Sequence, residues 1–174
     1  FGTFVARSME ALAKRGDWKV SVINPIGLPP LGLGALSDRY RALGDLPERS
    51  EENGVEVYRP RFTLIPKVGA RRNPSAIAKA TLSSVIALHK ATPIDLIDAQ
   101  FFFPDGPAAA ALAKTIGAPL TIKARGSDIN AWGLVDHARE AMLEAAQQAD
   151  GLLAVSEKLA DQMAALSIPR AAIT

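Results

Sequence analysis

The sequence contains no cysteine, which excludes disulfide bonds, thiolate metal ligands and a cysteine nucleophile. It lacks an apolar run of about 18 residues, so no stretch is typical of a membrane-spanning helix. It also begins at Phe1 without an initiator methionine and carries no signal peptide. Neither sign of charge is in large excess, because the chain has 20 Lys and Arg and 18 Asp and Glu. That net charge of +2 gives no argument for nucleic-acid binding, and we expect none. The lack of cysteine fits a reducing compartment, and we expect a cytoplasmic protein.

What the sequence does contain is an ordinary globular composition. Of its 174 residues, 48% are hydrophobic and 22% are charged, which is enough to build a core. The chain opens directly into a helical pattern and closes at Ile173-Thr174 as a new apolar segment begins. We therefore expect one domain over residues 1–174, truncated at both ends.

Helix-type and strand-type segments alternate along the whole chain. Spacing of three to four between apolar residues predicts helices over 3–15, 37–43, 74–91, 105–116, 135–149 and 156–166. Short alternating or apolar runs predict strands over 18–23, 55–60, 95–99, 120–124 and 151–155. The prolines and glycines of 27–34 predict a loop. This alternation is typical of an α/β protein with a Rossmann-like parallel sheet and helices on both faces.

In such sheets, ligands bind beyond the carboxyl ends of the strands. That rule selects four places, which are the chain start, 27–34, 100–106 and 125–130. We expect the turns containing Gly2, Asp105 and Asp128 to converge on one rim of the sheet.

The segment 125–130 is our main candidate for a binding loop. Gly126 permits a tight turn, and a guanidinium such as that of Arg125 can bind a phosphate or carboxylate through two parallel hydrogen bonds. Ser127 and Asn130 offer hydrogen bonds to an acceptor, and Asp128 is the candidate catalytic residue. The alternative is a purely structural loop in which Asp128 binds nearby backbone N–H groups.

Two further turns allow a functional and a structural interpretation. Gly2-Thr3 at a helix N-terminus is able to bind a donor phosphate, and Thr3 is otherwise a simple N-cap. Asp105 is either an acceptor-binding group or the N-cap of the alanine-rich helix that follows. At least two of the three rings of Phe101, Phe102 and Phe103 are expected in the core, because neighbouring side chains cannot all face one way.

A loop with Lys67, Arg71 and Arg72 forms a basic patch. Such a patch is able to attract an anionic acceptor or an anionic membrane surface, and the alternative is a solvated surface without a role. His89 and His137 stand far apart in the sequence, with no metal-ligand spacing around either, so we expect no metal site.

Four short motifs occur in a fixed order along the chain. They are Gly2-Thr3-Phe4-Val5, Phe101-Phe102-Phe103-Pro104-Asp105-Gly106, Arg125-Gly126-Ser127-Asp128-Ile129-Asn130 and Ala154-Val155-Ser156. Together they resemble the N-terminal domain of family 4 retaining glycosyltransferases, and the likeness spans nearly the whole chain.

The resemblance implies one half of a GT-B enzyme, which has two Rossmann-like domains facing across a cleft. It implies transfer of a sugar from a nucleotide-sugar co-substrate to a glycan or lipid-linked acceptor, with retention and without another cofactor. The N-terminal half shapes the acceptor side, and the C-terminal nucleotide-sugar domain, absent here, is its intramolecular partner. Many relatives carry His at the position of Arg125, so a proton-handling role does not carry over. The fragment alone is expected to be inactive.

Two other classes stay open at this point. One is a nucleotide-binding oxidoreductase module, although Gly27, Gly32 and Gly34 do not form the glycine pattern of a dinucleotide-binding turn. The other is a carbohydrate-binding or interaction domain without catalytic activity. A two-domain sugar-nucleotide epimerase is a near relative of the leading interpretation.

Overall fold

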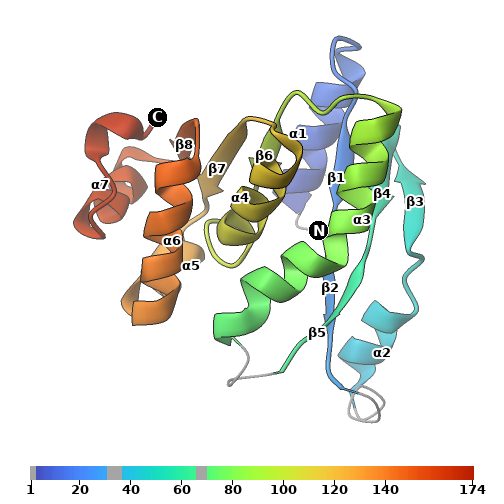
Figure 1. The fold of residues 1–174 in the computed structure, drawn as a ribbon, viewed down its shortest axis with the longest axis horizontal. Coiled ribbons are helices and arrows are strands. Elements are labelled where there is room, and N and C mark those ends of the chain that lie inside the picture. The colour runs from blue at the N-terminus through green and yellow to red at the C-terminus, as the bar shows by residue number, and fades with distance from the viewer. Residues whose placement is uncertain (1–2, 31–36, 66–69) are drawn as a thin grey trace. The chain divides into compact units, whose positions relative to one another are not determined.

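The computed structural model describes residues 3–30, 37–65 and 70–174, which form an α/β protein (Figure 1). Two compact units divide the chain, Phe1–Ala70 and Arg71–Thr174. Each unit has parallel strands of its own, and the α/β, Rossmann-like fold class is confirmed. That all 174 residues act as one domain stays a prediction.

The first unit contains two small sheets. In one sheet, β1 (Ser21–Ile23) pairs in parallel with β4 (Val55–Tyr58), and β3 (Arg49–Glu52) pairs antiparallel with β4. The other sheet pairs β2 (Ile26–Leu28) in parallel with β5 (Arg61–Thr63). The helices of this unit are α1 (Thr3–Lys14) and α2 (Asp38–Gly44).

The second unit is built on one wholly parallel sheet in the order β6-β7-β8. Its strands are β6 (Ile97–Ala99), β7 (Leu120–Ala124) and β8 (Gly151–Ala154). Its α-helices are α3 (Asn73–Ala91), α4 (Asp105–Ile116), α5 (Ser127–Asn130), α6 (Asp136–Gln148) and α7 (Glu157–Ala165). Single 3₁₀ turns occupy Ala70–Arg72, Trp132–Leu134 and Arg170–Ala172.

Small side chains bring α4 close to the sheet of the second unit. Helix α4 contacts β6, β7, α3 and α6 (Figure 1). A Cβ atom on Gly106 would lie 3.3 Å from Cγ2 of Ile122, so any larger residue at the start of this helix would require Ile122 of β7 to shift. Because β7 alternates buried and half-buried positions, Leu120, Ile122 and Ala124 point into this core.

Several local signals in the sequence led to correct boundaries. Pro74 lies in the first turn of α3, Gly117 ends α4 in the left-handed conformation with φ 71°, and the hydroxyl of Ser156 caps α7. Phe102 and Phe103 are fully buried, which confirms their assignment to the core.

Four short elements were not predicted. Residues 26–28 form β2 where a loop was expected; residues 31–34 of that loop lie outside the described part of the chain. Strands β3 and β5 and the single turn α5 were missed as well. The signal for β3 was present in Asn53-Gly54, whose φ angles of 53° and 83° form the two-residue turn between β3 and β4.

Candidate functional site

Two neighbouring strands of the second unit end in the turns that the sequence selected. After β6, residues Gln100 to Pro104 lead into α4, and after β7, Arg125 and Gly126 lead into α5. Strands β6 and β7 are parallel neighbours, so their carboxyl ends meet at the same edge of the sheet. The turns at 100–106 and 125–130 therefore form one rim, which we call the β6–β7 rim.

The side chain of Asp128 joins these two turns. It has no exposed surface, and its carboxylate accepts hydrogen bonds from the backbone N–H groups of Phe102 and Gly126, each at 2.7 Å. The N–H groups of Arg125 and Ile129 donate to it at 3.0 and 3.2 Å. A buried carboxylate is stable only when it is paired or hydrogen-bonded, and here four N–H groups fulfil that condition.

The guanidinium of Arg125 joins the same two turns a second time. Its Nε donates to the carbonyl oxygen of Gln100 at 3.2 Å, and its Nη2 donates to Oε1 of the same residue. The amide of Gln100 is oriented in turn, because its Nε2 donates to Asp98, which also accepts from the Thr121 hydroxyl at 2.9 Å. Both turns are thus fixed by side chains as well as by the sheet.

Two polar side chains of the rim are exposed and free to bind a ligand. Ser127 and Asn130 are exposed, and within the described residues neither side chain is engaged in a hydrogen bond. Gly126, with φ 116° and ψ −64°, makes the turn that presents them. The rim can therefore offer a hydroxyl and an amide to a ligand.

Asp105 lies beside this rim as the first residue of α4. Burial, and secondly the negative charge of Asp128, raise its pKa to about 6. Its proposed N-cap role is wrong, because Pro104 occupies the N-cap position and no side chain caps this helix. The half-buried Asp105 thus exchanges its proton at about pH 6, well above the range of an ordinary aspartate.

The other predicted residues are placed as follows. Gly2 and Lys67 lie outside the described residues. Thr3 is the exposed first residue of α1 in the first unit, so it lies inside the helix and not at its N-cap. Arg71 and Arg72 are exposed in the 3₁₀ turn that precedes α3. The structure brings together the turns of Asp105 and Asp128, whereas the Gly2 turn is not described.

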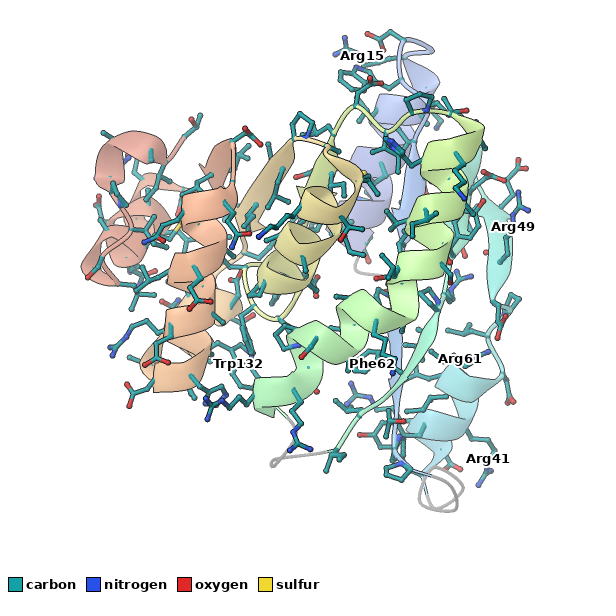
Figure 2. All side chains as sticks on the ribbon, in the orientation of Figure 1. Arg15, Arg41, Arg49, Arg61, Phe62 and Trp132 are labelled. Atoms are coloured by element: carbon teal, nitrogen blue, oxygen red, sulfur yellow. The ribbon has the colours of Figure 1, made fainter. Side chains whose placement is uncertain are left out.

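Sequence reasoning selected the turn 100–106 but gave the Gln100 side chain no role, and it did not select the segment Trp132–Leu134. The half-buried ring of Trp132, labelled in Figure 2, lies 5.0 Å from the ring of Phe103 in the adjoining turn. Leu134, two residues further along, is 79% exposed. The signal that could have identified this segment was the presence of Trp132 and Leu134 shortly after the polar motif 125–130, in a stretch for which no helix or strand was predicted.

No group of three or more His, Asp or Glu able to hold a metal ion occurs among the residues that the structure describes. A shallow, open hollow in the first unit is lined by Ala13, Trp18, Glu56 and neighbours, and none of the predicted site residues borders it. No helix in the described ranges is both long and apolar enough to cross a membrane.

The rim therefore combines two loops joined by hydrogen bonds, exposed hydrogen-bonding groups and an acid with a raised pKa at the carboxyl ends of parallel strands. A family model described as "Glycosyl transferase 4-like domain" matches residues 1–174. The chain belongs to this family. The glycosyl transferase 4-like domain seen here is an N-terminal family 4 glycosyltransferase domain, as the ordered motifs indicated.

A curated protein of Bacillus subtilis (strain 168), provisionally named the teichuronic acid biosynthesis glycosyltransferase TuaC, is similar to this domain. The two are 29% identical over 167 residues, which is 95% of this chain and 42% of that protein. The chain thus spans less than half the length of the relative it matches. The glycosyltransferase character is supported by both comparisons.

Proposed function

We propose that this domain forms the acceptor side of a retaining glycosyltransferase, which transfers a hexosyl group from a nucleotide sugar to a glycan or lipid-linked acceptor. The observation that carries the proposal is the β6–β7 rim, in which Asp128 and Arg125 fix two turns that display Ser127 and Asn130. The name of the Bacillus subtilis relative supports carbohydrate biosynthesis as the process.

In this proposal the rim acts by orientation. A sugar hydroxyl held by the side chains of Ser127 and Asn130 is fixed relative to the donor, and a fixed geometry lowers the entropic part of the barrier. Asp128 acts here through the backbone that it orders, which makes it a positioning residue. Asp105 is proposed to contact the acceptor: its raised pKa lets the carboxyl keep its proton up to about pH 6, where it can donate a hydrogen bond, and the ionised form accepts one at higher pH.

The remaining parts of the enzyme are proposed from the family. A second Rossmann-like half binds the nucleotide sugar and stabilises the departing diphosphate with cationic and backbone donors. The turn at Gly2 and Thr3 approaches that diphosphate, and no metal or further cofactor is needed in this half. The fragment alone is then inactive.

The basic residues before α3 fit a location at the inner face of a membrane. Arg71 and Arg72 are exposed next to each other, and Lys67 is close in sequence. Each basic group near an anionic lipid surface contributes about 1 kcal/mol of attraction. We propose a cytoplasmic enzyme that contacts the membrane peripherally where its acceptor is lipid-linked.

The test is an assay of the full-length protein with a panel of nucleotide sugars, following release of the nucleoside diphosphate. We expect Asn130→Ala and Ser127→Ala each to lower kcat/KM for the acceptor about tenfold. Gln147→Ala, at an exposed position of α6, is the matched control. Binding of NAD with no binding of any nucleotide sugar would contradict the proposal.

A further inference from the structure

Arg125 differs from the other arginines in how its charge is balanced. Among the described residues, three arginines are buried or half-buried, namely Arg59, Arg61 and Arg125. Arg59 pairs with Glu52, and Nε of Arg61 lies 4.0 Å from Glu48. Arg125 meets only the neutral oxygens of Gln100 within the same described ranges.

A half-buried cation without an anionic partner is costly. Removing a guanidinium from water weakens its solvation, and neutral acceptors replace only part of what is lost. The buried guanidinium of Arg59 is compensated fully by comparison. It donates to the carbonyl oxygen of Pro47, the hydroxyl of Ser50 and the carboxylate of Glu52. No such set surrounds Arg125 in the described part of the chain.

Asp128 is not an anionic partner of the Arg125 guanidinium. Its oxygens face four backbone N–H groups, including that of Arg125 itself, and the Arg125 side chain extends instead to the turn after β6. Asp98 is separated from Arg125 by the amide of Gln100.

The guanidinium is fixed and still has donors to offer. It has five N–H groups, of which two donate to Gln100, and the other three have no partner among the residues that the structure describes. Because Gln100 orients the guanidinium plane and Asp98 orients Gln100, the remaining donors have a set direction. A fixed planar fork is the group that binds carboxylates and phosphates best.

We propose that Arg125 is a specificity-determining residue that binds an oxyanion on the acceptor, so that the acceptor of this domain bears a carboxylate or a phosphate. This proposal rests on the proposed function in one respect, which is that the bound sugar is the acceptor of the transfer reaction. The binding of an anionic sugar at Arg125 does not itself depend on sugar transfer.

The experiment measures binding by the full-length protein directly. Methyl glucuronide and methyl glucoside differ by one carboxylate, and glucose 6-phosphate supplies a phosphate on the same ring. The Arg125 Nε–Hε signal in a nitrogen-15 NMR spectrum, assigned by its loss in Arg125→Lys, reports on the site. We expect the glucuronide or the phosphate to shift this signal, the stronger of the two identifying the anion, while the neutral glucoside leaves it unchanged.

Three results would overturn the inference. The first is an equal response to the glucoside and the charged sugars, and the second is no response to either charged sugar. The third is a nucleoside diphosphate that shifts the Arg125 signal at a lower concentration than both charged sugars, since the oxyanion would then belong to the donor. The titration measures binding and needs no sugar transfer. A failure of this inference can therefore be told apart from a failure of the proposed function, which the transfer assay tests.

Kinetics with an acidic acceptor provide the second readout. Arg125→Gln keeps a side chain able to hydrogen-bond but removes the charge, and we expect it to raise the acceptor KM about tenfold with kcat little changed. Arg139→Gln removes an exposed arginine that pairs with Asp136, and it should leave that KM unchanged. A donor KM that rises in place of the acceptor KM would contradict the inference.

Discussion

The carboxylate of Asp128 accepts a hydrogen bond of 2.7 Å from the backbone N–H of Phe102, which lies 26 positions earlier in the chain. This bond links the end of one strand to the end of the next. Because the same carboxylate also accepts hydrogen bonds from N–H groups of its own turn, this one side chain connects both turns of the rim.

Replacing Asp128 should unfold the rim as well as lower activity. In Asp128→Asn an amide NH₂ would face N–H donors, and each buried donor left without an acceptor costs about 1–3 kcal/mol. We expect the free energy of unfolding to fall by about 3 kcal/mol, measured by urea denaturation. Sequence reasoning alone favoured a catalytic role, in which turnover suffers far more than stability. A variant that unfolds like the wild type but does not turn over would restore that view.

Asp105→Asn should stabilise the protein at neutral pH. The pKa of Asp105 is raised from 3.8 to about 6, so the folded state keeps a proton that the unfolded state has lost. Stability therefore falls as pH rises through this window, by about 3 kcal/mol at most for a shift of this size. Asparagine removes this loss, and thermal unfolding at several pH values should show a flatter dependence.

Asp136→Asn is the matched control for that measurement, since Asp136 is the exposed first residue of α6. Its replacement should cost a few tenths of a kcal/mol through the helix dipole. An unchanged slope between pH 4 and about 6 in Asp105→Asn would show that Asp105 is not buried as the structure indicates.

Gly126→Ala should be destabilising through the backbone alone. With φ 116° and ψ −64°, Gly126 occupies a conformation that side chains rarely adopt, yet a Cβ atom there would meet nothing within 4 Å. We expect a loss of about 1–3 kcal/mol and a similar fall in acceptor binding as the turn relaxes. Gly117→Ala, at φ 71° in the milder left-handed region, should cost about 1 kcal/mol. Equal costs for the two variants would argue against strain at Gly126.

Gly133→Ala tests how the segment after the rim is held. A Cβ atom at this position would lie 2.5 Å from Cδ1 of Leu166, so the leucine must move. Overpacking of this kind costs about 1–3 kcal/mol, which chemical denaturation can measure. The double variant with Leu166→Ala should recover part of the loss beyond additivity, and strict additivity would mean that the two residues do not collide.

The fold was predictable to the extent that it follows local rules. Alternating segments, Pro74, Gly117 and the cap at Ser156 all act through neighbours in sequence, and each was interpreted correctly. Strands β2 and β5 were not, because they are three residues long and gain their stability from pairing with each other across the chain. A pattern in one segment contains no information about such a partner.

The candidate site shows the same division. The motif around Asp128 was found from its residue types and its place after a strand. The burial of Asp128 was not, because it depends on the Phe102 N–H of another turn. Gln100 was overlooked for a similar reason, since its importance lies in the Arg125 guanidinium that it orients.

The two-residue turn at Asn53 and Gly54 has a consequence for how the first unit acquires its structure. Strands β3 and β4 meet across this turn and can pair within microseconds, whereas β1 and β4 must first close a loop of about 30 residues, which is entropically less favourable. The hairpin is then expected to form ahead of the parallel pairing. Gly54→Ala should slow refolding in stopped-flow experiments, while Val22→Ala in β1 should mainly speed unfolding; the reverse pattern would place the nucleus at β1.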